Sequence, residues 1–100
     1  MIKHIVFWKL KDNALGNDKA ANALLMKEKL EALNGRIDGM LKLEVGLDFS
    51  GTDSSADVVL YTEFSSREAL DEYQDHPEHV AIKGFIMAVR SERRLADYEV

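Results

Sequence analysis

The N-terminal sequence reads Ile2-Lys3-His4-Ile5-Val6-Phe7-Trp8-Lys9-Leu10, and its alternation predicts a β-strand that is apolar on both faces. One set of alternate residues contains Ile2, Val6, Trp8 and Leu10 with His4 among them, and the other contains Ile5 and Phe7. Successive side chains of a strand point to opposite faces of its sheet. Such a strand needs cover on both sides, which is typical of the centre of a sheet.

The following segment predicts a loop and then a helix. Residues 11–16 are interpreted as the loop, with Asn17 as the helix N-cap and Asp18 in the first turn. Apolar residues then recur at helical spacing, which predicts a helix over residues 18–33. Asn34-Gly35 is expected to end this helix, because Asn and Gly tolerate the left-handed conformation common at a helix C-terminus.

Two further strands are predicted in the middle of the chain. Residues 41–49 alternate between an apolar and a mostly polar set, which suits a strand at a sheet edge. Residues 50–55 are rich in Ser, Gly, Thr and Asp and predict a loop. Residues 58–64 are largely apolar in both sets, like the N-terminal strand, and are therefore expected in the sheet centre.

The last third of the chain predicts two helices and a closing strand. Ser65, followed three residues later by Glu68, has the spacing of a capping box and predicts a helix N-terminus. Pro77 interrupts that helix and is expected to begin another, because proline lacks a backbone N–H and is favoured in the first helical turn. Residues 93–100 alternate again and predict the final strand.

The predicted order βαββαβ is that of a ferredoxin-like α+β fold with a four-stranded antiparallel sheet, in one domain over residues 1–100. The first and third strands are central in this topology. The helices can cover only one face of the sheet, so the opposite face, which includes Ile5 and Phe7, needs a partner. We therefore expect a homodimer in which the sheets of two copies meet and form an α/β barrel.

Composition excludes several functional classes. The chain has 100 residues and a formal net charge of −5, which argues against a nucleic-acid-binding surface. It contains no cysteine, which excludes disulfides and thiolate chemistry. No apolar run approaches the roughly 20 residues that span a bilayer, and the N-terminus lacks the apolar core of a signal peptide. We expect a cytoplasmic protein that acts on neither nucleic acid nor membrane.

Histidine side chains are the first candidates for chemistry. His79 is the third residue of the helix that Pro77 is expected to begin, where the helix dipole favours a neutral imidazole that can act as a base. His4 belongs to the more apolar set of its strand and is expected to be semi-buried, so its ring nitrogens need partners. A structural role in capping or packing remains open for both. His76 is interpreted as an N-cap or surface residue.

Neither a metal nor a cofactor is predicted. His76 and His79 are three residues apart with acidic residues nearby. Pro77 between them interrupts the continuous helical face that two metal-binding histidines require. Arg93 and Arg94 are interpreted as a solvated or interfacial pair rather than as an anion-binding site.

Three segments together point to a known family: Met1-Ile2-Lys3-His4-Ile5-Val6, Tyr73-Gln74-Asp75-His76-Pro77-Glu78-His79 and Ala96-Asp97-Tyr98-Glu99-Val100. With these segments the chain resembles the stress-responsive A/B barrel domain (Dabb) family of the dimeric α/β barrel superfamily. The resemblance implies a ferredoxin-like monomer whose sheet pairs with that of its partner to form a barrel. It also implies a small pocket between sheet and helices, with His4, Tyr73 and His79 at the positions that act on a substrate.

Three functions from different classes remain open. In the first, the chain is a cofactor-independent enzyme in which His79 or His4 takes a proton and Tyr73 steadies the enolate of a small carbonyl or polyketide-like compound. Trp8 and Phe85 would then be substrate-binding walls of the pocket, although aromatic residues are also common in protein cores. In the second, the same pocket binds a small ligand without turnover. In the third, the chain is a structural, stress-associated dimer.

Overall fold

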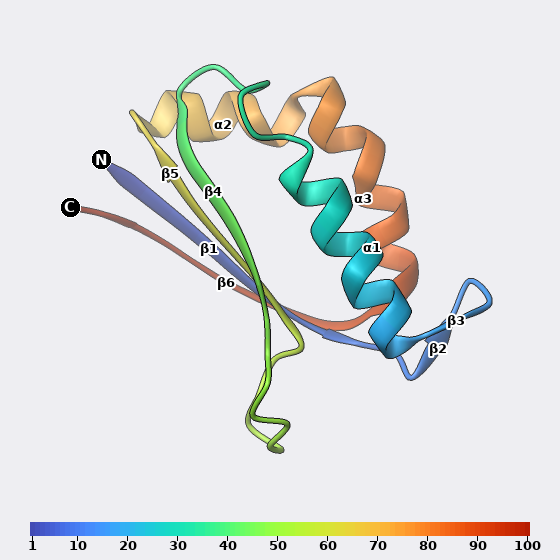
Figure 1. The fold of residues 1–100 in the computed structure, drawn as a ribbon. Helices are drawn as coiled ribbons and strands as arrows, with labels where there is room; N and C mark the ends of the chain where they lie inside the picture. Colours follow the sequence, from blue (N-terminus) through green and yellow to red (C-terminus); the bar gives the residue numbers. More distant parts are fainter.

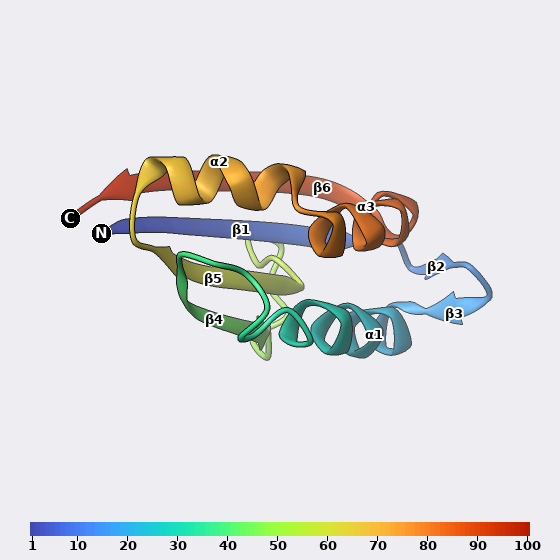
Figure 2. The same cartoon turned by 90° about the horizontal axis from the view of Figure 1, so that it is seen from above.

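The computed structural model describes all residues from Met1 to Val100 as two layers, with helices on one side of a sheet (Figure 1, Figure 2). The elements are, in chain order, β1 (Ile2–Leu10), β2 (Asn13–Ala14), β3 (Asn17–Asp18), α1 (Lys19–Glu31), β4 (Met40–Leu47), β5 (Val58–Phe64), α2 (Arg67–Asp75), α3 (Pro77–Val89) and β6 (Arg90–Glu99). The predicted βαββαβ order is present, with the small β2–β3 hairpin added to it.

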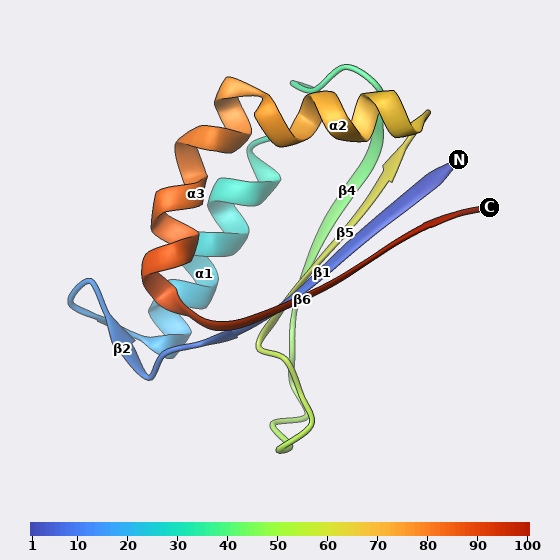
Figure 3. The same cartoon turned by 180° about the vertical axis from the view of Figure 1, so that it is seen from behind.

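The main sheet has the strand order β4-β5-β1-β6, and every neighbouring pair is antiparallel. The central strands are therefore β1 and β5, the two whose sequences are apolar on both faces. The two ends of the chain lie side by side on β1 and β6 (Figure 3), where the Val100 N–H donates to the Met1 carbonyl over 3.0 Å. The ferredoxin-like prediction is confirmed.

One face of β1 is buried beneath the helices. Val6 on this face is 1% exposed, and His4 and Trp8 beside it are also buried. They belong with Met26 and Leu30 of α1 to the buried interior of the domain. This inner face of the sheet therefore carries both the apolar core and the strand histidine.

The other face of the sheet has no helix over it (Figure 1). Phe7 on this outer face is 42% exposed, and Ile5 is half-buried. In the strand register Phe7 is paired with Val59 and Ile5 with Tyr61, so the outer face is apolar across both central strands. The predicted uncovered face is confirmed.

The segment predicted as a loop over residues 11–16 contains the β2–β3 hairpin. Leu15 and Gly16 at its tip have positive φ angles of 51° and 78°, the pair of left-handed residues that a tight two-residue hairpin turn requires. The buried Asn22 of α1 fixes the hairpin by donating from its amide to the carbonyls of Ala14 at 3.0 Å and Asn17 at 3.4 Å. Periodicity could not reveal two strands of two residues each.

Several predicted boundaries are wrong by a few residues. The N-cap of α1 is Asp18 rather than Asn17, because the Asp18 carboxylate accepts the Ala21 N–H at 2.8 Å. The N-cap of α2 is Ser66, one residue after the predicted Ser65. Helix α1 ends at Glu31, and the last strand begins at residue 90 instead of 93.

The edge strand β4 is shorter than predicted. It ends at Leu47, and Phe49 is fully exposed beyond it. The pairing of β4 with β5 shifts between Met40 and Lys42, which leaves Leu41 exposed instead of on the inner face. Leu43 is therefore the first residue of β4 that is buried. None of the helices in the fold is both long and apolar enough to span a membrane.

Candidate functional site

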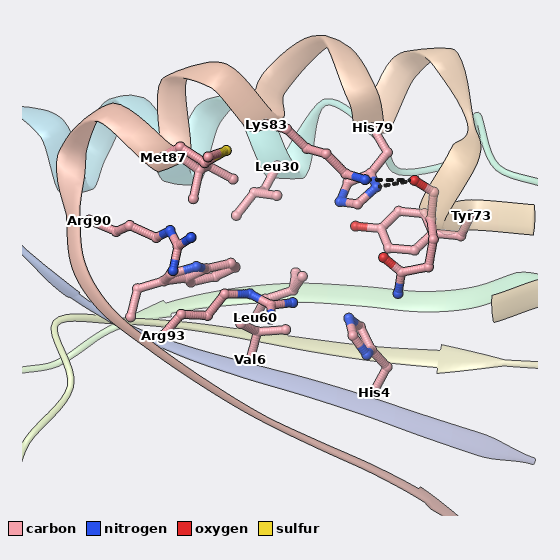
Figure 4. Close-up of a pocket in the computed structure, with 13 residues that line it drawn as sticks. His4, Val6, Leu30, Leu60, Tyr73, His79, Lys83, Met87, Arg90 and Arg93 are labelled. Carbon is pink, nitrogen blue, oxygen red and sulfur yellow. Dashed lines mark hydrogen bonds between the residues drawn. The ribbon is translucent and has the colours of Figure 1, made fainter. Parts of the chain in front are cut away.

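A cavity of about 240 Å³ lies between α3 and the inner face of the sheet (Figure 4). His4, Tyr73 and His79 all line it, although they come from β1, α2 and α3. Figure 4 shows these three side chains gathered at one end of the cavity. The fold therefore brings together the three residues that the sequence offered as candidates for chemistry.

Tyr73 lies at the centre of this group. It follows Ala69 and Leu70 on the buried face of α2 and has no exposed surface. Its ring stacks on that of His79 with centroids 4.1 Å apart and meets that of His4 edge-on at 6.2 Å. Its hydroxyl group is buried and has no hydrogen-bond partner in the protein. Such a group is rare, because burying an unpaired hydroxyl is costly, and a ligand oxygen would satisfy it.

The Tyr73 hydroxyl is held in its protonated form. Burial raises the pKa of Tyr73 well above its usual 10, and the positive charge of Arg93 only partly opposes this. A phenol that keeps its proton can donate a hydrogen bond to a carbonyl or enolate oxygen. It cannot serve as a base near neutral pH.

His79 is placed by the start of α3. His76 caps this helix by accepting the Glu78 N–H on its Nδ1 at 3.1 Å, and Pro77 is the first helical residue. The Nδ1 of His79 lies 3.4 Å from the carbonyl oxygen of Gln74. A carbonyl oxygen can only accept, so this contact places the proton on Nδ1 and leaves the lone pair on Nε2.

His79 is neutral near pH 7. Burial is the main cause that lowers its pKa below the usual 6.5, and the positive charge of Lys83 lowers it further. The hydrogen bond to the Gln74 carbonyl raises the pKa; this influence is weaker than that of burial but stronger than that of Lys83. The predicted direction is confirmed, but the main cause is desolvation rather than the helix dipole.

His4 finds its partner on the last strand. The register of β1 and β6 places His4 opposite Asp97, and the Asp97 carboxylate accepts a hydrogen bond from Nδ1. Its Nε2 is left free. The backbone of His4 is also held, because the buried Thr62 hydroxyl donates to its carbonyl at 2.7 Å. The sequence analysis did not identify Asp97 for this role. Asp97 belongs to the alternation of residues 93–100, and the pairing of this strand with β1 places it beside His4.

The two predicted wall residues have different positions. Trp8 lines the cavity, and its indole N–H is buried without an acceptor. Phe85 does not line the cavity, so its assignment as a substrate-binding wall is wrong. It points away because it is two residues from the cavity-lining Lys83, more than half a helical turn around α3, and the Lys29 ammonium of α1 lies 5.1 Å above its ring.

Basic residues at the cavity were not anticipated as part of a site. Lys83, Arg90 and Arg93 all line it, and no Asp or Glu does. Arg93 and Arg94 are both exposed, in agreement with the prediction of solvated residues. They do not act as one pair, since Arg94 is paired in register with Phe7 on the outer face and Arg93 lines the cavity. Two spacings in the sequence could have indicated these positions. Lys83 follows His79 by four residues and therefore lies on the same face of α3, and Arg93 alternates onto the same face of the last strand as Asp97.

His76 lies outside this cavity and acts as a helix cap, as predicted. The structure contains no group of three or more His, Asp or Glu side chains placed to hold a metal ion.

Comparisons with known proteins agree with this architecture. A family model described as Stress responsive A/B Barrel Domain matches residues 2–100. A solved structure of a dimeric protein of unknown function with a ferredoxin-like fold, from Bacteroides fragilis, is 34% identical with a TM-score of 0.86, covering 99% of this chain and 95% of that one. No relative is found among curated proteins.

Two other solved structures share the fold at lower identity. A dimeric ferredoxin-like protein of unknown function from Thermobifida fusca is 19% identical with a TM-score of 0.85, covering 99% of this chain and 90% of that one. A Dabb family protein from Mesorhizobium loti is 24% identical with a TM-score of 0.70, covering 99% of this chain and 95% of that one. With the family model matching nearly its whole length, the chain belongs to the stress-responsive A/B barrel domain (Dabb) family.

Proposed function

We propose that this protein is a cofactor-independent acid–base catalyst that removes a proton next to the carbonyl group of a small compound, such as a polyketide-like ketone. The observation that carries the proposal is the buried hydroxyl of Tyr73, which has no partner in the protein and belongs to a ring that contacts the imidazole rings of His4 and His79. A substrate carbonyl oxygen is the acceptor that this hydroxyl lacks.

His79 is the base in this proposal. Its Nδ1 donates to the Gln74 carbonyl, so the lone pair of Nε2 is available to take a proton from the carbon next to the substrate carbonyl. Its lowered pKa keeps the imidazole neutral at physiological pH. The C–H electron pair then moves into the carbonyl, and an enolate forms whose oxygen accepts the hydrogen bond of Tyr73. The proton on His79 returns to the product.

His4 is the alternative base, whose free Nε2 would take the same α-proton in place of His79 and return it to the product. The Asp97 carboxylate fixes its ring orientation through Nδ1 and supplies a counter-charge when Nε2 takes up a proton. Asp97 is thus a positioning residue in this proposal, since it acts through His4. No step of this chemistry draws on a metal or an organic cofactor.

The test is solvent deuterium exchange into the α-position of a benzyl ketone such as phenylacetone, followed by NMR in D₂O. We expect the protein to accelerate exchange and the His79→Gln variant to lose on the order of 10²-fold of that acceleration. His76→Asn is the matched control, because Asn also caps helices and His76 lies outside the cavity. Exchange that is equal in wild type and His79→Gln would refute the catalytic role.

Ligand binding without turnover is the second candidate. The unpartnered indole N–H of Trp8 favours it, because this donor can hold a ligand oxygen but has no part in proton transfer. In that case small carbonyl or phenolic compounds raise the melting temperature, yet no deuterium exchange occurs. A chain that shows neither effect would instead have the structural, stress-associated role.

We also propose that the working form is a homodimer joined through the outer face of the sheet. The outer face is apolar around Ile5 and Phe7, and the 34% identical relative from Bacteroides fragilis is dimeric. Burial of this face against a second copy would close the two sheets into a barrel. Sedimentation at micromolar concentration tests this, and a monomer there contradicts it.

A further inference from the structure

The charge of the cavity is opposite to that of the protein. The chain carries a formal net charge of −5, yet the ionisable side chains that line the cavity beside the histidines and Tyr73 are Lys83, Arg90 and Arg93. No carboxylate lines it. A local excess of positive charge in a cavity with apolar walls favours a negatively charged ligand.

Two of these cations have no partner in the protein. The Lys83 ammonium donates to the Gln74 carbonyl at 2.9 Å. By contrast, the guanidinium groups of Arg90 and Arg93 form neither an ion pair nor a side-chain hydrogen bond in the structure, whereas Arg36 and Arg67 are each paired with a glutamate. The two cavity arginines are therefore free to bind an anion.

The two arginines enter the cavity from the end opposite the proposed chemistry. Figure 4 shows Arg90 at that end, whereas the side chain of Arg93 extends toward the middle of the cavity and thus toward His4 and Tyr73. Along β1, the backbone positions of His4 and Trp8 are four residues, or about 13 Å, apart. The Arg93 side chain extends into the middle of the cavity, so the distance that a ligand has to span is shorter than this backbone separation. A ligand that reaches both ends must therefore have two polar groups separated by an apolar part.

Apart from Arg93, the side chains around the middle of the cavity are apolar. Val6, Leu30 and Leu60 line the middle of the cavity and are buried. They offer no hydrogen bond to a polar linker. The middle of the ligand is therefore expected to be a hydrocarbon chain or ring.

A third donor belongs to the arginine end. Trp8 is paired in register with Arg93, so the two side chains are neighbours on the inner face. The Trp8 indole N–H is buried and has no acceptor, and the residue is 4% exposed. A carboxylate can accept from a guanidinium and an indole N–H together, since it has two oxygens with about four acceptor sites.

We propose that the cavity takes a small keto acid, with its carboxylate held by Arg90, Arg93 and the Trp8 N–H and its ketone at Tyr73. This assignment rests on the proposed function, because it specifies the substrate class of that same site. The cavity volume of about 240 Å³ limits the ligand to a small molecule.

The test uses ω-benzoyl carboxylates of increasing chain length, namely benzoylpropionate, benzoylbutyrate and benzoylvalerate, each compared with its primary amide. Binding is measured by calorimetry and by the fluorescence of Trp8, which is the only tryptophan in the chain. We expect at least one carboxylate to bind roughly tenfold more tightly than its amide, since hydrogen bonds to a charged group are the stronger ones. The preference should weaken as salt concentration rises.

Arg90→Gln and Arg93→Gln should each reduce the ratio of carboxylate to amide affinity, and the double variant should bring it close to one. Arg94→Gln is the matched control: it removes the same charge from the next residue of β6, on the outer face. Its ratio should equal that of the wild type. Equal affinity of carboxylate and amide in the wild type, an unchanged ratio in the double variant, or no binding of any carboxylate at millimolar concentration would each overturn the assignment. Tighter binding of phenyl phosphate than of every carboxylate would overturn it in favour of a phosphate ester.

The failure of this assignment differs from the failure of the proposed catalysis. If the ratio is large but no α-deuterium exchange occurs, the anion site stands and the acid–base role falls. If neutral ketones exchange rapidly while carboxylates show no preference, the catalytic role stands and the keto acid assignment falls. Wild type and His79→Gln are compared in both assays to separate the two results.

Discussion

Adjacent residues of β1 lie in two different environments. Val6 on the inner face is covered by the chain's own helices, whereas Phe7 on the outer face is 42% exposed. The inner face can therefore place polar groups such as His4 in a cavity beneath the helices, but the outer face offers an apolar surface for a partner. One strand thus supplies both the candidate site and the candidate interface, because its side chains alternate between the two faces.

The same substitution on the two faces should have very different effects. Val6→Asp buries a carboxylate without a partner, which is expected to cost at least about 3 kcal/mol and to leave the chain largely unfolded. Phe7→Asp should stay folded but become monomeric, since it places charges in the proposed interface. Circular dichroism and sedimentation measure both outcomes. If Val6→Asp is as well folded as Phe7→Asp, the two faces of β1 do not differ in burial as described.

Removal of one tyrosine hydroxyl on each side of the sheet should affect activity differently. Tyr73→Phe should lower α-deuterium exchange on the order of 10²-fold, because the enolate loses its donor. Its melting temperature should be equal or higher, since an unpaired buried hydroxyl is removed. Tyr61→Phe is the control on the outer face, where the hydroxyl donates to Glu63, and it should keep full exchange activity. A large loss of stability in Tyr73→Phe would contradict this account.

A smaller effect is expected at the edge of the inner face. Asp97→Asn keeps the shape of the side chain but weakens its hold on His4, so exchange should fall roughly tenfold with little change in ketone affinity. Its pH–rate profile should also change, which a purely structural role would not cause. Glu99→Gln serves as the control, because its exposed ion pair with Arg67 contributes little. An unchanged profile in Asp97→Asn would remove Asp97 from the mechanism.

The smallest effect is the pH dependence of stability. The pKa of His79 is lower in the folded chain than its unfolded value near 6.5, so the unfolded chain binds more protons below that pH. The stabilising contribution of neutral His79 is therefore complete above pH 6.5 and is lost as the pH falls through and below that value. Urea unfolding at several pH values should show a shallower slope for His79→Gln than for the wild type. Equal slopes would show that burial does not disfavour protonation of His79.

The fold was largely predictable because its signals are local. Alternation over residues 2–10 and 58–64 predicted the central strands, and Pro77 correctly marked the start of α3. The hairpin at Leu15 and Gly16 was missed because its strands are too short to show a period. The N-cap errors at Asp18 and Ser66 arose because neighbouring residues of the same capping type compete, and only the backbone conformation selects one.

The candidate site was predictable only in part. His4, Tyr73 and His79 were identified, and the structure places them around one cavity. Phe85 was assigned to the cavity wall by its aromatic character alone, and its position around α3 excludes it. The role of Asp97 depends on a strand pairing more than 90 residues apart in sequence, which no local pattern contains.

The order of elements, the two-faced central strands and the kinds of side chain available for proton transfer follow from the amino-acid sequence, because they depend on residue type and on spacing within each segment. The packing of the folded chain was needed to show that Arg90 and Arg93 share a cavity with Trp8, that Asp97 binds His4, and that the Tyr73 hydroxyl has no partner. The physical reason is that hydrogen bonding and desolvation depend on distances between distant segments, and these distances are fixed when the strands pair and the helices pack.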